Sequence, residues 1–297
     1  MRVRIATRGS QLARWQAERV ATLIRSADPS ADVSLVVVET SGDRRTDVPI
    51  WEIGGQGVFV KEVQAAVLER RADAAVHSAK DLPSLQAPGL VIAAVPERGD
   101  PRDALVGSTL DDLPAGATVA TGSVRRRAQL AWLRPDLTFT GLRGNIATRL
   151  GKVPPGGAVV VAAAALGRLG LSARAAEVLD VSVMLPQVGQ GSLAVECRDG
   201  DEDLRRMLSA IEHGPSRAAL ECERGFLARL GGGCDLPVGA YARCDGDEVV
   251  VEGMLASADG RVMLRSSRTG RVAAPGDLGS ALAGELLASG GADLLAG

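Results

Sequence analysis

The sequence has very few aromatic residues, with three tryptophans, three phenylalanines and one tyrosine among its 297 residues. Proteins that bind single-stranded nucleic acid use aromatic side chains as stacking platforms for the bases, and few such side chains are present here. The formal net charge of −2 also lacks the positive excess that attracts nucleic acids and anionic membrane surfaces. These shortages argue against a nucleic-acid-binding protein.

Features of metal sites, secretion and membrane insertion are missing as well. The four cysteines (Cys197, Cys222, Cys234 and Cys244) form no CxxC pair, and two histidines are too few for the usual zinc sites. The N-terminal residues lack the apolar core of a signal peptide, and the longest apolar run, 158–166, falls well short of the roughly 20 residues that span a bilayer. We therefore expect a cytoplasmic protein with no metal and no membrane association.

What the sequence does contain is an alternation of strand-like and helix-like segments. Strands are predicted over 2–7, 33–39, 73–77, 105–106, 118–121, 137–140, 159–163 and 193–197. Helices are predicted over 11–26, 59–71, 203–211 and 217–230, and from residues 123 and 146. This pattern predicts an α/β fold of two similar lobes with mainly parallel sheets, joined near 96–103, with a ligand cleft between them. From Val238 onward, short strands and a final helix predict a small α+β domain.

Three polar turns follow strands and precede helices, at 7–10, 121–126 and 142–149. Their candidate ligand-binding residues are Arg8, Ser10, Thr121, Ser123, Arg125, Arg126, Arg143 and Arg149. Backbone N–H groups at a helix start, hydroxyls and guanidiniums together form a receptor for carboxylates or phosphates. Consecutive helical residues diverge by about 100°, so Arg125 and Arg126 are expected to serve different ligand groups. A solvent-exposed basic helix face is the alternative, because 31 of the 34 basic residues are arginine.

Another candidate is the turn His77-Ser78-Ala79-Lys80-Asp81-Leu82-Pro83, which ends an apolar strand. Lys80 is one of only three lysines, and a neighbouring lysine and aspartate could pair with an anion and a cation of one ligand. A solvated turn closed by proline is the alternative. His77 by itself is more typical of a packed histidine than of an acid or base.

The stretch Arg229-Leu-Gly-Gly-Gly-Cys234-Asp235 places one thiol just after a helix. Glycines there allow the backbone to leave the helix with positive φ, and they leave space beside the sulfur. The sequence is compatible with an ordinary helix C-cap followed by cysteine, or with a thiol that carries a ligand.

Taken together, five arginines at strand–helix junctions and one acid, Asp81, suit a ligand with many carboxylates. Eight segments, in order, resemble the porphobilinogen deaminase family: RIATRGSQLARWQA, GGQGVFVKE, AVHSAKDLP, DPRDALV, TGSVRRRAQL, LRGNIATRL, VGQGSLAVECR and GGGCDLPVGA. They run through nearly the whole chain. The resemblance implies two periplasmic-binding-protein-like lobes, at 1–96 with 192–210 and at 100–188, and a cofactor-attachment domain at 214–297.

The resemblance also implies an activity. The family's enzymes are transferases of tetrapyrrole (porphyrin and heme) biosynthesis that join four porphobilinogen units, release ammonia at each step, and yield the linear tetrapyrrole hydroxymethylbilane. The primer is a dipyrromethane cofactor bound through a thioether, which the match places on Cys234. The implied partners are porphobilinogen and the growing oligopyrrole chain, and the protein is expected to be a monomer.

The matched positions imply roles for individual residues. Asp81 is the implied catalytic residue, at the pyrrole nitrogens, where a carboxylate would stabilise the azafulvene cation left by loss of ammonia and shuttle protons. The implied cofactor-binding residues are Cys234, Ser78, Lys80, Asp81, Thr121, Ser123, Arg125 and Arg126. The implied substrate-binding residues are Arg8, Ser10, Arg143 and Arg149. Because a helix C-terminus does not lower a thiol pKa, Cys234 is an anchor rather than a turnover nucleophile.

The chain departs from the family pattern at Gln56, where the family usually has lysine, at Gly122, where it usually has serine, and over 153–165. None of these removes a proposed catalytic group, so they bear on rate and loop closure. A solute-binding protein for a polycarboxylate is the main alternative. It accounts for two lobes and many arginines, but it predicts an export signal and gives Cys234 no task.

Overall fold

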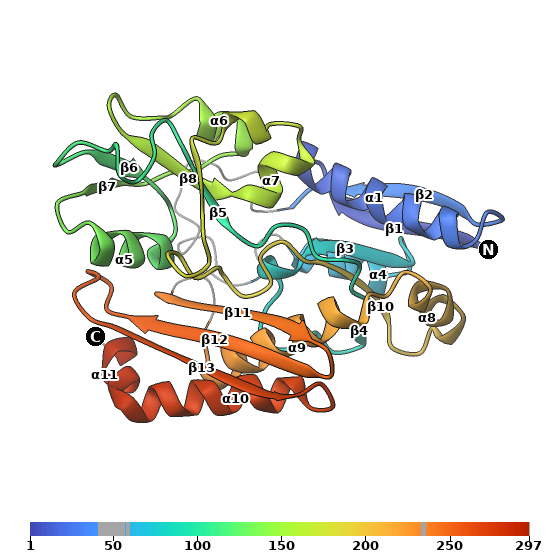
Figure 1. The fold of residues 1–297 in the computed structure, drawn as a ribbon. Helices are drawn as coiled ribbons and strands as arrows, with labels where there is room; N and C mark the ends of the chain where they lie inside the picture. The colour runs from blue at the N-terminus through green and yellow to red at the C-terminus, as the bar shows by residue number, and fades with distance from the viewer. Residues whose placement is uncertain (41–56, 58–59, 233–235, 297) are drawn as a thin grey trace. The chain divides into compact units, whose positions relative to one another are not determined.

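The computed structural model describes residues 1–40, 57, 60–232 and 236–296. Within these residues the chain forms two compact units, Met1–Gly99 with Ser192–Arg217, and Asp100–Gly191 with Ala218–Gly297. The described part of the chain contains three separate β-sheets, one in the first unit and two in the second (Figure 1).

The sheet of the first unit has the order β2-β1-β3-β10-β4. Its strands are β1 (Arg2–Arg8), β2 (Asp32–Val38), β3 (Ala74–Ser78), β4 (Leu90–Ala94) and β10 (Leu193–Arg198). β1 pairs in parallel with β2 and β3, whereas β10 is antiparallel to both of its neighbours. Four strands therefore run in one direction, and β10 is inserted between β3 and β4 in the reverse direction.

Helices cover both faces of this sheet because its strands are apolar on both sides. They are α1 (Gln11–Ala27), α4 (Lys61–Leu68) and α8 (Glu202–Ser209). The β1 residues Val3 and Ile5 pack with α1 and α8 in one core cluster. Ala6, the next residue along β1, points to the opposite face and packs with α4. This alternation is the period of two that a strand imposes on its side chains.

The first sheet of the second unit repeats the same plan, with the order β7-β6-β8-β5-β9. Its strands are β5 (Asp103–Val106), β6 (Thr118–Ala120), β7 (Thr138–Thr140), β8 (Ala158–Ala162) and β9 (Glu177–Leu179). β6 is parallel to β7 and β8, and β5 is antiparallel to β8 and β9. The helices are α5 (Val124–Leu133), α6 (Ile146–Leu150), α7 (Ala163–Arg168) and the short 3-10 turn at Ser172–Arg174. α5 packs on one face, through Leu130, and α6 and α7 pack on the other, through Leu150 and Leu166.

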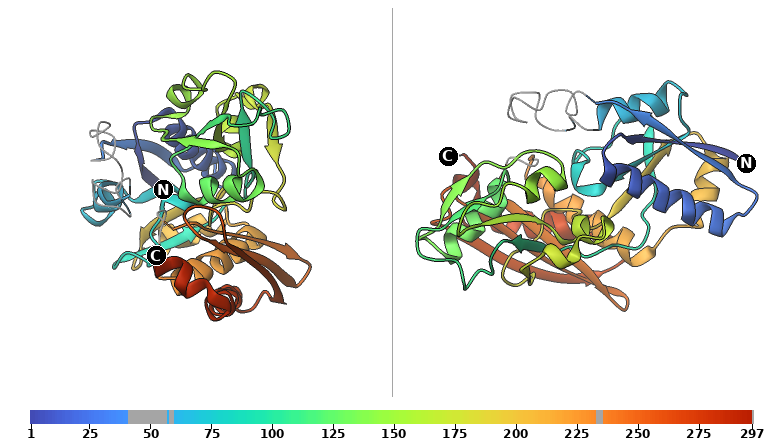
Figure 2. Two further views of the ribbon diagram at one scale, coloured as in Figure 1. Left: turned by 90° about the vertical axis from the view of Figure 1, so that its left-hand side faces the viewer. Right: turned by 90° about the horizontal axis from the view of Figure 1, so that it is seen from above.

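The remaining sheet is an antiparallel meander of β11 (Val238–Asp245), β12 (Glu248–Ala256) and β13 (Met263–Arg271). It packs with α9 (Gly214–Arg229) and α10 (Pro275–Leu286), which Figure 1 and Figure 2 show against this sheet. A π-helical segment (Leu287–Gly291) and α11 (Ala292–Ala296) follow. Phe226 of α9 is fully buried in this core, which contains no other aromatic side chain among the described residues.

The predicted fold class is confirmed: two α/β sheets in which four of five strands run the same way, and a smaller α+β part at the C-terminus. The sequence prediction missed β4 and β9, which carry little periodic pattern in three to five residues. The three-domain division at 1–96 with 192–210, 100–188 and 214–297 stays a prediction, as does a cleft between lobes.

Candidate active site

In the first unit, the predicted residues lie at the carboxyl ends of two neighbouring parallel strands. Arg8 is the last residue of β1 and Ser78 is the last residue of β3, and these strands pair in parallel. Ser10 caps α1, and its Oγ accepts a hydrogen bond from the Ala13 backbone N–H at 3.3 Å. The carboxyl edge of an α/β sheet is where such folds bind ligands. The structure therefore gathers Arg8, Ser10 and Ser78 at one edge.

Lys80 and Asp81 lie in a single 3-10 turn, Ala79–Asp81, that directly follows β3. The Ala79 N–H donates to the carbonyl of Ser192 at 3.0 Å, and the Leu82 N–H donates to the carbonyl of Ala79 at 3.2 Å. Both Lys80 and Asp81 are half-buried. The turn is thus tied to the residue that precedes β10, and it is not a freely solvated loop.

Beneath this turn lies a buried polar cluster that the sequence did not reveal. His77 is packed inside the unit, as expected for a lone histidine, but its Nε2 lies 3.1 Å from Oε2 of Glu196 on β10. The Glu196 carboxylate also accepts hydrogen bonds from Gln64 and Gln86. The only sequence signal was an acidic residue inside the apolar run of β10.

In the second unit, Thr121 and Ser123 form the start of α5. The Thr121 Oγ1 accepts from the Ser123 N–H at 3.2 Å, and the Ser123 Oγ accepts from the Arg126 N–H at 3.4 Å as the N-cap. The helix predicted from residue 123 is therefore present, and the structure shows that Ser123 is its N-cap.

Arg125 and Arg126 are 2% and 6% exposed, so they do not form the solvated basic face that was the alternative interpretation. They were expected to serve different groups, but both guanidiniums meet the carboxylate of Asp103 on β5. Arg125 Nη2 lies 2.7 Å from Oδ2, and Arg126 Nη2 lies 2.6 Å from Oδ1. The directions of two consecutive helical side chains differ by about 100° at Cα. Arginine side chains are long, so two of them on a helix packed over the sheet can still reach the same buried acid.

The electrostatics of this triad favour a charged Asp103. Complete burial by itself would raise the pKa of Asp103, but the guanidiniums of Arg125 and Arg126 outweigh burial and hold that pKa well below its usual range. Gln190 adds a further hydrogen bond to Oδ1 at 2.8 Å. Two cations and one anion leave one surplus positive charge. Arg125 Nε is buried and has no hydrogen-bond partner among the described residues.

The third predicted turn contains Arg143 and Arg149. Arg149 is the basic residue of the last turn of α6, and its Nε donates to the Gly144 carbonyl at 2.8 Å. Arg143 lies between β7 and α6, and its buried Nη1 has no hydrogen-bond partner within the described residues. β6 is parallel to both β7 and β8, so the Thr121 and Arg143 segments emerge at the same edge of their sheet.

Sequence reasoning passed over Arg168, which ends α7 after β8. Its Nη2 donates to the Gly191 carbonyl at 2.6 Å, and desolvation by burial lowers the pKa of Arg168 to about 10. The sequence feature that could have identified Arg168 is the one used at the other turns: an arginine in the segment that follows a parallel strand.

Cys234 lies outside the described residues, but the end of the preceding helix is visible. Gly231 has a φ of 67° just after α9, and its N–H donates to the Ala228 carbonyl at 3.1 Å, so the predicted glycine cap is present. At Gly232 the space is taken: a Cβ there would lie 2.0 Å from Leu236 Cδ1. The absence of a side chain at Gly232 therefore makes room for Leu236, whereas the sequence analysis expected the glycines to leave space for a ligand.

The described cysteines do not supply an activated thiol. Desolvation by burial raises the pKa of Cys222 to about 12 and that of Cys197 to about 11, and it also raises the pKa of Cys244. A buried apolar environment disfavours the thiolate, which is the reactive form.

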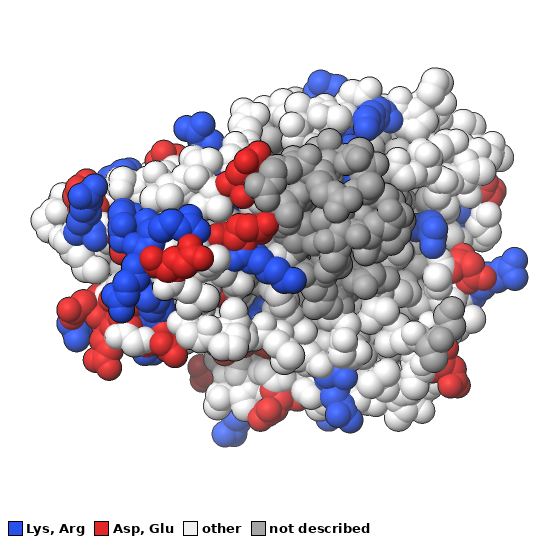
Figure 3. Space-filling view, turned by 180° about the vertical axis from the view of Figure 1, so that it is seen from behind, with Lys and Arg blue, Asp and Glu red and all other residues white. Residues whose placement is uncertain are grey.

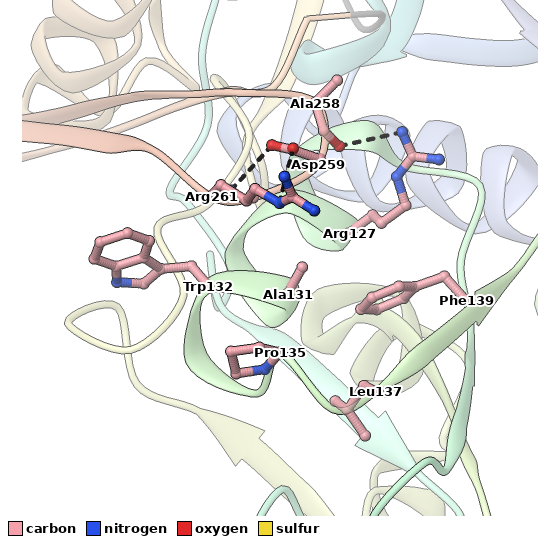
Figure 4. A pocket seen from close by; sticks show the side chains of 10 residues that line it. Arg127, Ala131, Trp132, Pro135, Leu137, Phe139, Ala258, Asp259 and Arg261 are labelled. Atoms are coloured by element: carbon pink, nitrogen blue, oxygen red, sulfur yellow. Dashed lines mark hydrogen bonds and ion pairs between the residues drawn. The ribbon is translucent and has the colours of Figure 1, made fainter.

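A separate hollow of about 830 Å³ lies in the second unit between α5 and the turn that joins β12 to β13 (Figure 4). Trp132, Phe139 and Arg261 are among its lining residues. None of the predicted site residues lines it, so it is distinct from the candidate site. On the face shown in Figure 3, acidic and basic side chains are interspersed among the described residues.

Comparisons with known proteins agree with the sequence motifs. The family model described as "Porphobilinogen deaminase, dipyromethane cofactor binding domain" matches residues 3–206, and "Porphobilinogen deaminase, C-terminal domain" matches residues 218–288. A protein of Roseiflexus castenholzii named porphobilinogen deaminase is 49% identical over 298 residues, which cover 99% of this chain and 98% of the relative. One of Brevibacillus brevis with the same name is 43% identical over 299 residues, covering 99% and 96%. Among solved structures, the methionine binding protein MetQ has a TM-score of 0.44 at 12% identity, covering 71% of this chain and 89% of that chain.

Proposed function

The chain belongs to the porphobilinogen deaminase family, and on that premise we propose which of its residues carry out the reaction. It is a transferase that joins four porphobilinogen units, releases ammonia and gives hydroxymethylbilane, and it uses a dipyrromethane cofactor. That cofactor, when bound, supplies the pyrrole to which successive substrate units are attached.

Asp81 is proposed as the catalytic residue. Loss of ammonia from the substrate leaves a cationic pyrrole, and a carboxylate close to the ring nitrogen stabilises that charge as it develops. The observation that carries the proposal is the position of Asp81, in a turn fixed at the carboxyl edge of the first sheet. Asp81 also serves as the group that accepts and returns protons at the pyrrole.

The arginines are proposed to hold carboxylate side chains of cofactor and substrate. The residues fit a polyanionic group: Arg143 Nη1 and Arg125 Nε are buried donors with no partner among the described residues, and the Arg125–Asp103–Arg126 triad has one surplus positive charge. Buried donors normally have partners, so these two mark places where an acceptor would be stabilised. Asp103 and the Leu185 and Val160 carbonyls already accept from every other guanidinium nitrogen of Arg125 and Arg126, so the contribution of these two arginines is chiefly electrostatic.

The remaining assignments follow the family motif. Ser78, Lys80, Thr121 and Ser123 would bind the cofactor, and Arg8, Ser10 and Arg149 would bind the substrate. Cys234 would form the thioether and keep it through turnover. We also propose that the protein acts as a monomer in the cytoplasm, without nucleic acid or membrane. In the described residues, no helix combines the length and apolar character needed to cross a bilayer.

Intact-mass measurement of the purified protein tests the attachment. We expect a covalent increment equal to two linked pyrrole units, lost in Cys234→Ser and retained in Cys244→Ser, which alters a half-buried cysteine outside the glycine loop. A solute-binding protein would show no increment in either form. An unmodified mass in a folded, cofactor-replete preparation would refute the attachment to Cys234.

A further inference from the structure

One buried carboxylate contacts the chain on both sides of the Lys80–Asp81 turn. Glu196 Oε2 lies 3.1 Å from Nε2 of His77, which lies two residues before the start of the turn at Ala79. Glu196 Oε1 accepts a hydrogen bond from Nε2 of Gln86, which follows the turn, at 3.2 Å. Gln64 of α4 donates to Oε2 at 2.8 Å. Glu196 therefore joins β10, α4 and the two ends of the segment that carries Asp81.

This arrangement is costly in free energy, because Glu196 is only 2% exposed and His77 only 5%. On this face of the sheet the neighbouring core is apolar and includes Ala75, directly opposite Glu196 across the strand pair. Burying a carboxylate costs several kcal/mol before its partners compensate, and apolar replacements of buried ionic groups are often neutral or stabilising. Stability alone therefore does not account for an acid at this position.

The backbone of the turn is attached to the strand that carries Glu196. The Ala79 N–H donates to the carbonyl of Ser192, and the Leu82 N–H donates to the carbonyl of Ala79. Ser192 is the residue before β10, and Glu196 is within β10, so one strand supplies both the backbone and the side-chain attachment. The His77 Nε2 contact lies outside hydrogen-bond alignment, which leaves Gln64 and Gln86 as the directional bonds.

We infer that Glu196 is a positioning residue for Asp81: it holds the segment on both sides of the catalytic turn so that the Asp81 carboxylate is kept at the reacting pyrrole. The inference rests on the proposed catalytic role of Asp81. A displacement of about 1 Å at a reacting group can lower a rate by about 100-fold. An interaction that acts only through transition-state stabilisation lowers kcat and leaves KM largely unchanged.

The test compares Glu196→Gln with a matched control, Asp73→Asn. Asp73 is a largely buried carboxylate at the opposite end of β3, paired with Arg4, so its loss weakens the same unit without touching the turn. For Glu196→Gln we expect kcat per cofactor-loaded molecule to fall about 10- to 100-fold, with KM changed less than about threefold. For Asp73→Asn we expect a lower melting temperature and a kcat within about twofold of wild type.

A second variant protects the test against misfolding of Glu196→Gln. Gln86 is exposed, so Gln86→Ala releases one side of the turn without emptying the core. We expect kcat to fall about threefold to tenfold, with little change in melting temperature. Wild-type kcat in folded, loaded Glu196→Gln, or in Gln86→Ala when Glu196→Gln does not fold, would overturn the inference.

A double-mutant cycle separates positioning from a general loss of stability. In an Asp81→Glu background, where the carboxylate is already displaced by one methylene, Glu196→Gln should cost less than about threefold in kcat, because the two effects are coupled. Full additivity would overturn the inference. Wild-type kcat in Asp81→Asn would refute the proposed catalytic role of Asp81, and with it the inference. An inactive Asp81→Asn together with a Glu196→Gln variant that behaves like Asp73→Asn would refute the inference alone.

Discussion

Arg126 donates to a single oxygen of Asp103 through two nitrogens, Nε at 3.0 Å and Nη2 at 2.6 Å. Arg125 takes the other carboxylate oxygen, so one acid fully buried in the second unit neutralises half of the charge of two adjacent arginines. Removing the Asp103 carboxylate would leave two buried guanidiniums without their anion, so the second unit should lose stability.

Asp103→Asn should lower the free energy of unfolding at neutral pH by about 3–5 kcal/mol, the usual cost of breaking a buried ion pair. Chemical denaturation measures it. Asp136→Asn is the control, because Asp136 pairs with Arg134 at the surface, where hydrogen bonding lowers the pKa of Asp136 to about 2, and little stability should be lost. Equal losses in the two variants would show that the buried triad does not stabilise the unit.

The same triad predicts a pH dependence. Because the folded-state pKa of Asp103 is held below the unfolded value of about 3.9, its contribution is complete above that pH. The contribution is lost as pH falls through the folded-state pKa, since the carboxyl then binds a proton in both states. Wild-type stability should therefore fall more steeply below about pH 4 than that of Asp103→Asn. The free energy of unfolding of both proteins is measured across this pH range. If it falls equally steeply in wild type and in Asp103→Asn, the prediction is wrong.

Asp81→Asn should keep the covalent cofactor and lose turnover by about 10²- to 10⁴-fold, the range for losing a catalytic acid–base group. The amide has nearly the same shape, but it neither stabilises a cation nor carries the proton. Intact mass confirms loading, and ammonia release measures turnover. Near-wild-type ammonia release would refute the role of Asp81.

Arg143→Ala should raise KM for porphobilinogen by about 10- to 150-fold, because a charged hydrogen bond contributes about 1.5–3 kcal/mol. The unpartnered Nη1 is the donor available for a carboxylate. Arg127→Ala is the control. Arg127 lies two residues from Arg125 on α5 but lines the separate hollow, where it donates to the Ala258 carbonyl at 3.3 Å (Figure 4). A similar rise in KM for both variants would indicate a nonspecific loss of positive charge.

Gly231→Ala should lower the free energy of unfolding by about 1–2 kcal/mol, since its φ of 67° is unfavourable for a residue with a Cβ. Thermal denaturation measures the change. Gly200→Ala is the control, because a Cβ there meets nothing within 4 Å and the backbone is not left-handed. If both alanines are tolerated equally, the end of α9 does not depend on the glycine cap.

Local sequence patterns were sufficient for most helices and strands, for the polar turns that precede α1, α5 and α6, and for the family. The reason is that periodicity, capping and motif order are encoded by residues close together in the chain. The same reasoning predicted that polar turns follow the strands that end at Arg8 and Ser78, and the parallel pairing of β1 and β3 then places these two residues at one edge of the sheet. Short strands such as β9 were missed because three residues carry too little pattern.

Only the tertiary structure decided which groups those residues meet. The reversed strand β10 is inserted beside β3, and this pairing brings Glu196 within reach of Gln64, 132 residues away in sequence. In the second unit the helix carrying Arg125 and Arg126 packs over β5, so both guanidiniums meet Asp103. Such partners are selected by strand order and side-chain reach in three dimensions, and no local pattern encodes either.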